Sequence, residues 1–280
     1  MYKRQGFHLV LLAENQTGWQ NLLKLSTDSF LNGFYYKPRM DKTTLEERGE
    51  GLIAINGHLG SSIAHHLLQF EQTKNEQHWN NAVDEARWHA ETFGTNENGE
   101  PCFYVELQMH SVDEQRKINP HLVRLARELD LPLVGDNDAH FLGADDWDDH
   151  DTLCCISMQK NKDDPARLHY PKDLYVKSPG EMSEAFTEWP EAVENTVKIA
   201  ERCNVDLDFS ANHAPVVKIV SPWSDLPDDA DAARALIETW TSEHEVGSTA
   251  WYTAFCNSFS LEPFDAVNDP TSPEELERQC

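Results

Sequence analysis

The sequence has little positive charge, no C-x-x-C pair of cysteines and no long apolar run. Its formal net charge is −26, so most of the surface repels a phosphate backbone and generic nucleic-acid binding is not expected. None of its six cysteines forms a C-x-x-C pair, which favours a reduced, intracellular protein. No apolar run approaches membrane-spanning length. These features predict a soluble, cytoplasmic protein without a membrane partner.

Several catalytic signatures are also missing from the sequence. It contains no G-x-x-x-x-G-K-[ST], G-x-G-x-x-G, G-x-S-x-G or H-E-x-x-H motif. Phosphate-cradling loops and serine-hydrolase mechanisms therefore have no support.

What is present is an alternation of short apolar runs with amphipathic stretches, which is typical of an α/β fold. The expected strands are residues 8–13, 51–55, 102–108 and 131–135, the first of them buried. The expected helices are residues 15–30, 44–48, 63–70, 77–93, 113–129, 145–158, 190–203 and 231–241. Residues 32–39 break the pattern and are expected to form a loop.

The pattern divides the chain near residue 210. Residues 1–209 are expected to form one domain and residues 210–280 an acidic linker and less regular tail. From Asp206 onward, fifteen acidic residues stand against three basic ones. Prolines 215, 222 and 227 mark the linker.

Polar residues follow two of the predicted strands directly. His58 comes after the second strand, and Asp138 and His140 come after the fourth. Side chains at the carboxyl ends of strands face the functional pocket of many α/β folds, and nitrogen and oxygen donors together suit Zn, Mn or Fe. On spacing alone the alternative stays open that Asp138 caps a turn and His140 is an ordinary loop histidine.

Other candidates favour structural interpretations. The acidic run 145–151 is interpreted as the first turn of a helix whose apolar face carries Trp147, Cys154 and Met158, with a second metal site as the alternative. The remaining candidate histidines lack a partner at ligand spacing: His65 and His66 lie within a helix, and surface positions are expected for His78, His89, His169, His213 and His244. The basic and aromatic loop 34–39 could contact a polynucleotide by stacking and charge, or pack into a domain interface.

Ten short segments occur in the order found in one known family. They are residues 8–18 (HLVLLAENQTG), 21–26 (NLLKLS), 33–39 (GFYYKPR), 50–55 (EGLIAI), 104–110 (YVELQMH), 131–141 (LPLVGDNDAHF), 150–156 (HDTLCCI), 163–167 (DDPAR), 175–182 (YVKSPGEM) and 194–205 (ENTVKIAERCNV). Together they resemble the PHP domain of C-family replicative DNA polymerases, the DNA polymerase III alpha subunits.

The resemblance implies a partial, distorted (β/α) barrel of PHP type with metals at the strand ends. Carried over by position, the metal ligands are His8, His58, Asp138 and His140, and the cofactor is a divalent metal (Zn, Mn or Mg). The family's opening H-x-H strand and further acidic and histidine ligands would precede this sequence. The polymerase palm, with its catalytic aspartates, would follow it, so no catalytic residue is assigned.

Three functions follow from these expectations. The first is a part of the replicative polymerase alpha subunit, structural in isolation, that works with the remainder of that subunit or other replisome proteins and meets DNA only indirectly. The second is a metal-dependent 3′–5′ exonuclease or phosphoesterase acting on DNA ends. The third is a non-catalytic scaffold. Whether the chain is an enzyme is left open by the sequence.

Overall fold

The structure is a computed structural model. It describes residues 6–207, Phe209, and five single residues further along the chain: Ala235, Thr239, Ser248, Ala250 and Trp251. The chain divides into two compact units, Met1–Asp206 and Leu207–Cys280, and the elements described below belong to the first. The predicted linker and the helix expected over residues 231–241 lie outside the described residues, apart from Ala235 and Thr239.

A four-stranded sheet in the order β1-β2-β3-β4 forms the centre of the first unit. The last three strands are parallel, and β1 runs antiparallel to β2. The parallel strands therefore end at one edge of the sheet, where the antiparallel β1 begins. The strands are β1 (Val10–Ala13), β2 (Leu52–Asn56), β3 (Phe103–Gln108) and β4 (Leu133–Asp136).

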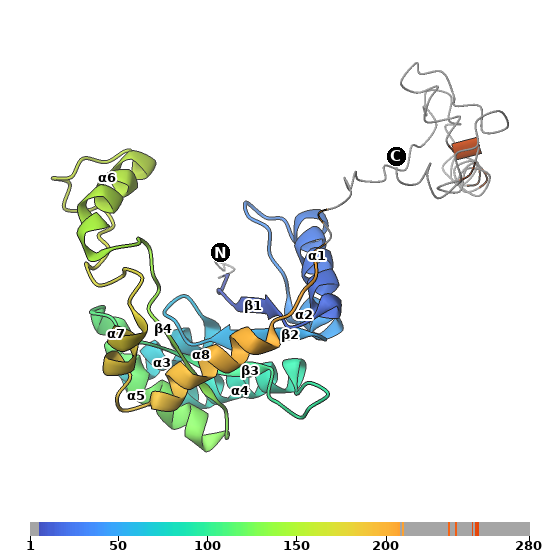
Figure 1. Ribbon diagram of the computed structural model, residues 1–280, viewed down its shortest axis with the longest axis horizontal. Helices are drawn as coiled ribbons and strands as arrows, with labels where there is room; N and C mark the ends of the chain where they lie inside the picture. Colours follow the sequence, from blue (N-terminus) through green and yellow to red (C-terminus); the bar gives the residue numbers. More distant parts are fainter. Residues whose placement is uncertain are drawn as a thin grey trace, which may run out of the picture. The chain divides into compact units, whose positions relative to one another are not determined.

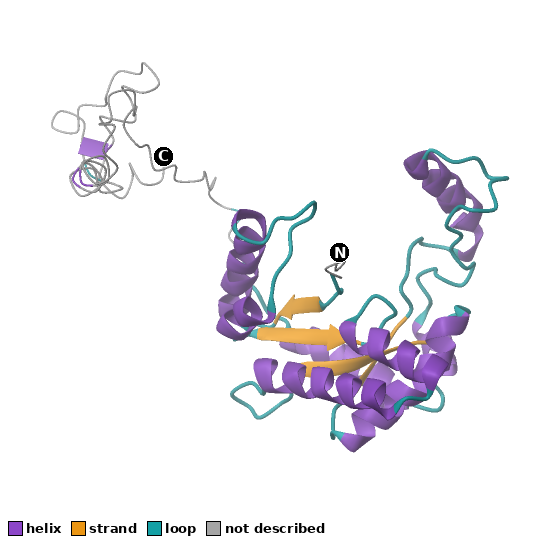
Figure 2. Cartoon of the chain, turned by 180° about the vertical axis from the view of Figure 1, so that it is seen from behind, coloured by secondary structure: helices purple, strands orange, loops and turns teal. Residues whose placement is uncertain are grey.

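Helices cover both faces of this sheet (Figures 1 and 2). Helices α3, α4 and α5 pack along one face, and α8 packs against β4 on the other. Helix α6 stands away from this layered body in both views. The helices are α1 (Gln16–Leu31), α2 (Lys42–Arg48), α3 (Ser62–Thr73), α4 (Glu76–Phe93), α5 (Asp113–Glu128), the 3-10 turn η1 (Ala144–Asp146), α6 (Trp147–Met158), α7 (Pro179–Ala185) and α8 (Pro190–Arg202).

Side-chain alternation along the strands separates the two faces. Phe103, Val105 and Leu107 belong to the large core beneath α3, α4 and α5. Tyr104 points the other way and packs with Ile199 of α8. Polar residues at even positions of β3 and β4 are consequently placed on the α8 face, near the strand ends.

The mixed α/β architecture and the partial-barrel class predicted from the sequence are confirmed. Local signals account for several helix starts: the Asn15 side chain accepts the Gly18 N–H at 3.0 Å before α1, and the Asp41 carboxylate accepts the Thr44 N–H at 2.9 Å before α2. No helix in the described part of the chain is long and apolar enough to cross a membrane.

Two features of the local structure differ from the expectations. The first strand is not buried: Val10 is 40% exposed because, among the described strands, β1 pairs on one side only. The sequence pattern missed α7, which a capping box between Ser178 and Glu181 begins. In α6 the expected residues Trp147, Cys154 and Met158 are half-buried, at helical spacing from the buried Asp151 and Cys155.

Candidate metal centre

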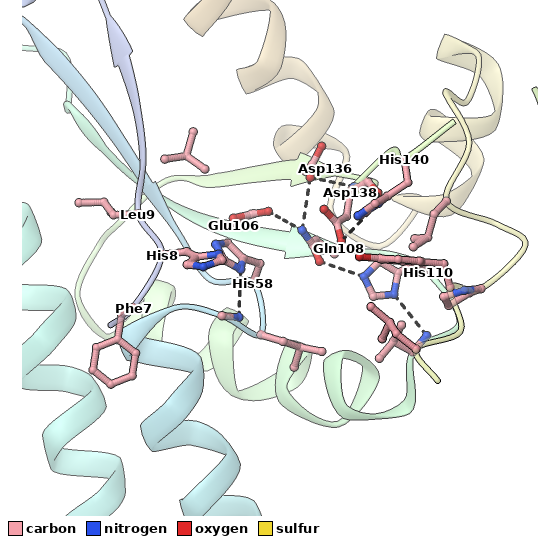
Figure 3. A pocket seen from close by; sticks show the side chains of 18 of the residues that line it. Phe7, His8, Leu9, His58, Glu106, Gln108, His110, Asp136, Asp138 and His140 are labelled. Atoms are coloured by element: carbon pink, nitrogen blue, oxygen red, sulfur yellow. Dashed lines mark hydrogen bonds and ion pairs between the residues drawn. The ribbon is translucent and has the colours of Figure 1, made fainter. Parts of the chain in front are cut away.

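A pocket of about 870 Å³ lies at the carboxyl ends of the parallel strands. All four residues predicted as metal ligands line it: His8, His58, Asp138 and His140 (Figure 3). His8 reaches it because β1 is antiparallel, so that the residues before β1 meet the end of β2. The structure thus brings together four residues that are up to 132 positions apart in the sequence.

His8 and His58 form one side of the pocket, with ring centroids 5.7 Å apart. Both contact Gly60: the His8 N–H donates to the Gly60 carbonyl at 2.9 Å, and the Gly60 N–H donates to His58 Nδ1 at 3.0 Å. A Cβ at Gly60 would lie 3.0 Å from His58 Cε1 and 3.2 Å from His8 Nδ1. The glycine therefore permits this approach of the two rings.

Burial, and next the neighbouring His8, hold the pKa of His58 below its usual value, against the raising effect of Asp138 and Asp136. A neutral ring is the form that binds a metal. Its Nδ1 already accepts the Gly60 N–H, so the proton sits on Nε2. A metal would have to displace that hydrogen bond or change the tautomer.

Asp138 and His140 form the opposite side of the pocket. Asp138 has the left-handed φ of 49°, which aspartate tolerates better than most residues, and its N–H donates to Asp136 Oδ2 at 2.9 Å. His140 Nδ1–H donates to the Asp138 carbonyl at 2.5 Å. This contact leaves Nε2 as the free lone pair, the arrangement commonly seen for metal-binding histidines.

Four further polar residues of the pocket were missed at the sequence level. They come from the end of β3 and the residues after it, and from the end of β4: Glu106, Gln108, His110 and Asp136. The signal was available, because Glu106 and Gln108 interrupt an otherwise apolar strand at alternate positions. Polar side chains on the buried face of a strand need partners, and so mark a site.

These residues form a hydrogen-bonded chain across the pocket floor (Figure 3). Gln108 Nε2 donates to Glu106 Oε1 at 2.7 Å and lies 3.3 Å from Asp136 Oδ2. His110 Nε2 lies 2.9 Å from Gln108 Oε1, and the Val112 N–H donates to His110 Nδ1, so the imidazole donates to the amide oxygen. The chain fixes Gln108 with its amide group toward the two carboxylates.

Glu106 is the most perturbed acid of the pocket. It is 3% exposed, and its Oε2 has no hydrogen-bond partner among the described residues. Burial, followed by repulsion from Asp136, raises the pKa of Glu106 to about 8. A buried carboxylate oxygen without a partner is costly and is readily satisfied by a proton or a cation.

The donor set fits a divalent cation chemically, but it is arranged as two pairs. Imidazole nitrogens and carboxylate oxygens suit Zn or Mn, and carboxylates also suit Mg. Within the described part of the chain, no three His, Cys, Asp or Glu side chains converge closely enough to form a ready-made metal site. An ion held by these residues would therefore have to draw the two sides of the pocket together.

The acidic run before and within α6 has other uses. Asp146 Oδ2 accepts the Gly143 N–H at 2.8 Å, and Asp148 pairs with Lys162 at 2.7 Å. Asp151 is buried and accepts from Arg167 Nη2 at 2.8 Å. These contacts support the structural interpretation of the run.

One histidine expected at the surface is buried instead. His89 on α4 is 3% exposed and stacks on Phe103, with ring centroids 5.1 Å apart. His169 is exposed, as expected, whereas His78 is half-buried. His213 and His244 lie outside the described residues.

Residues 1–110 match the family model of the PHP domain. The DNA polymerase III subunit alpha of Borreliella burgdorferi is 40% identical over 228 residues, which cover 80% of this chain and 18% of that protein. The same subunit of Thermus aquaticus is 39% identical over 205 residues, 72% of this chain and 16% of that protein. The chain therefore spans less than a fifth of the length of these relatives.

Proposed function

This chain is a sequence relative of the DNA polymerase III alpha subunits and contains PHP-domain sequence; from this we propose that it acts in DNA replication as the PHP portion of such a subunit. In this role it holds a divalent metal in the pocket between His8 and His140 and serves as a structural platform. Its partners are the remainder of an alpha subunit or other replisome proteins. The chain contacts DNA only through these partners, because its net charge of −26 repels phosphate.

The observation that carries this proposal is the pairing of the candidate ligands. His8 and His58 on one side, and Asp138 and His140 on the other, line one pocket without forming a cluster of three. A site of this kind can bind a structural ion but does not hold reacting groups to the tolerance that catalysis needs.

The alternative is a metal-dependent phosphoesterase that acts on DNA 3′ ends, and Glu106 favours it. A divalent ion in such a site acidifies a water molecule and polarises a phosphoryl oxygen. Glu106, whose pKa is raised to about 8, would carry a proton at neutral pH and would donate it to a reacting group in the pocket. The Nδ1–H contact of His140 would keep Nε2 directed at the ligand.

Two measurements on the purified chain separate these functions. Metal content after dialysis against Mn²⁺ or Zn²⁺ tests the pocket, and release of nucleotides from a 3′-labelled DNA tests hydrolysis. Bound metal without nucleotide release, together with co-purification with the remainder of an alpha subunit, supports the structural role. Metal-dependent nucleotide release that His140→Ala abolishes would overturn the structural role in favour of the phosphoesterase.

A further inference from the structure

A second pocket, of about 630 Å³, lies on the other side of the segment before β1. The two pockets share the lining residues Phe7, His8 and Leu9. The second one is lined by parts of α2, α3 and α4 and by Asn56 at the end of β2. Asn56 follows Ile55, which packs toward the α8 face, so strand alternation directs Asn56 to the opposite face of the sheet.

The floor of this second pocket is made of three buried polar side chains from three elements. Asn56, Ser62 and His89 are 1%, 7% and 3% exposed. Burying polar groups without full pairing costs about 1–3 kcal/mol each, so an apolar floor would have been more stable here. Retained polarity at the bottom of a pocket is typical of a ligand site.

Hydrogen-bond roles on this floor are determined by one carbonyl group. The Glu85 carbonyl can only accept, so His89 Nδ1, 2.7 Å away, carries the proton. Burial lowers the pKa of His89, which keeps the ring neutral, and Nε2 then accepts from Asn56 Nδ2 at 3.2 Å. Asn56 Oδ1 is left without a partner among the described residues. The floor therefore has one unpaired acceptor, Asn56 Oδ1, which a ligand with a hydrogen-bond donor would satisfy.

The rim of the pocket has the opposite character. Lys37, Arg39 and Lys42 line it, although the whole chain is strongly acidic. Lys42 is neutralised by Glu85 at 2.6 Å, and Asp41 is used to cap α2. The Lys37 ammonium makes no ion pair or hydrogen bond with any described residue. Positive charge is thus available at the rim for an anion.

The size of the pocket suits a nucleotide, because its volume falls in the range of small-molecule sites. Trp88 of α4 is half-buried in the lining, and the Lys42 ammonium lies over its ring, 4.4 Å from the centroid.

We infer that this second pocket binds a deoxynucleoside monophosphate, with its phosphate at the Lys37 rim and an amino group of its base donating to Asn56 Oδ1. Inorganic phosphate would leave the amide oxygen unpaired, and an apolar ligand would leave both ends unsatisfied. Adenine, cytosine and guanine carry the required exocyclic amino group. The choice of a deoxynucleotide rests on the proposed role at DNA, whereas the binding chemistry does not.

The inference is tested by calorimetric titration of the whole chain with dAMP in the presence of EDTA. Removing metal separates this test from the proposed metal centre: Asp138→Asn should leave dAMP binding unchanged. Lys37→Ala should weaken dAMP binding about tenfold, the effect of losing one charge-assisted contact. Lys24→Ala, which removes an exposed lysine of α1 that lies outside the pocket lining, should leave the affinity unchanged.

Asn56→Leu and a comparison of ligands test the floor. Asn56→Leu should weaken dAMP binding at least about tenfold while thermal unfolding shows a folded protein. Inorganic phosphate should bind more weakly than dAMP. Absence of dAMP binding at millimolar concentration, equal effects of Lys37→Ala and Lys24→Ala, or phosphate binding as tight as dAMP binding would each overturn the inference. Because Lys37 is exposed, the comparison of Lys37→Ala with Lys24→Ala still tests the inference if the Asn56→Leu variant fails to fold.

Discussion

The two pockets beside the segment before β1 differ in their chemistry although they share part of their walls. The pocket on the α8 side gathers imidazoles and carboxylates, including Glu106 with an unpartnered oxygen. The pocket on the side of α3 and α4 has a rim with lysine and arginine over a floor that contains the Asn56 amide. One suits a cation and the other an anion.

The difference shows how a sheet directs polar and apolar side chains to opposite faces. Neighbouring residues of a strand point to opposite faces, so β3 sends Glu106 to one side and Leu107 to the core on the other. The backbone after β2 also approaches β3 closely here: a Cβ at Gly57 would lie 2.2 Å from the Glu106 carbonyl oxygen. The end of β3 thus supplies a carboxylate to one pocket, whereas the positive charge of the other comes from the loop before α2 and from Lys42 of α2.

The largest expected effect separates the two pockets by their metal affinity. Asp138→Asn should lower Mn²⁺ affinity at least about 100-fold, because it removes an anionic ligand. Binding of dAMP should stay within about twofold. Calorimetric titration measures both, with Asp113→Asn, an exposed acid of the first turn of α5, as the matched control. Equal losses of Mn²⁺ affinity in Asp138→Asn and Asp113→Asn would show that Asp138 is not a ligand of the metal centre.

The next effect is the pH dependence of stability that Glu106 creates. Its pKa in the folded state, about 8, lies above the usual 4.5, so the folded protein binds the proton more tightly than the unfolded chain. The free energy of unfolding should therefore fall as pH rises from about 5 to about 8, by up to roughly 4 kcal/mol. Urea unfolding in EDTA at pH 6 and pH 9 measures it.

Glu106→Gln should make this pH dependence much flatter, because the amide does not titrate. Glu76→Gln, which changes an exposed acid in the first turn of α4, should behave like the unmodified chain. A Glu106→Gln protein with the full pH dependence would mean that other groups cause it.

A smaller effect concerns the approach of His8 and His58. Gly60→Ala should lower Mn²⁺ affinity about tenfold, because the new Cβ lies 3.0 Å from the His58 ring and 3.2 Å from that of His8 and must push them apart. Gly180→Ala, in α7 with no heavy atom closer than 4.0 Å, is the control. Unchanged affinity in Gly60→Ala would show that the spacing of the rings is not important.

The smallest effect compares two residues with left-handed backbone beside the two pockets. Tyr36 (φ 61°) and Asp138 (φ 49°) both adopt it, but only aspartate is suited to it. Tyr36→Gly should raise the free energy of unfolding by at most about 1 kcal/mol, since glycine also costs chain entropy. Thermal unfolding measures it. A clear loss of stability would indicate that the Tyr35–Tyr36 ring contact at 4.7 Å matters more.

Periodicity in the sequence predicted most of the fold. The apolar runs gave four strands and the amphipathic stretches seven of the helices, since both signals are local. The antiparallel pairing of β1 depends on its partner β2, which follows only after α1 and α2, and no local pattern encodes it. Helix α7 was missed because Pro179 and Gly180 suggest a turn unless the capping box is noticed.

The candidate site was predicted in part. His8, His58, Asp138 and His140 came from ordered motifs and strand ends, and the structure places them around one pocket, while their role as ligands stays a prediction. Glu106 was overlooked although it and Gln108 interrupt the apolar pattern of β3 at alternate positions, and His89 has no sequence neighbour that predicts burial. In the fold Gln108 donates to Glu106 and the neighbouring Asp136 raises its pKa, while His89 is paired with Asn56 from another element.

The most direct test of the metal centre is anomalous diffraction from a crystal of the chain soaked in MnCl₂. We expect one manganese peak in the pocket, with the His8 and His58 rings on one side and Asp138 and His140 on the other, and loss of the peak in Asp138→Asn. A crystal with full manganese access and no peak in this pocket would contradict the proposed metal centre.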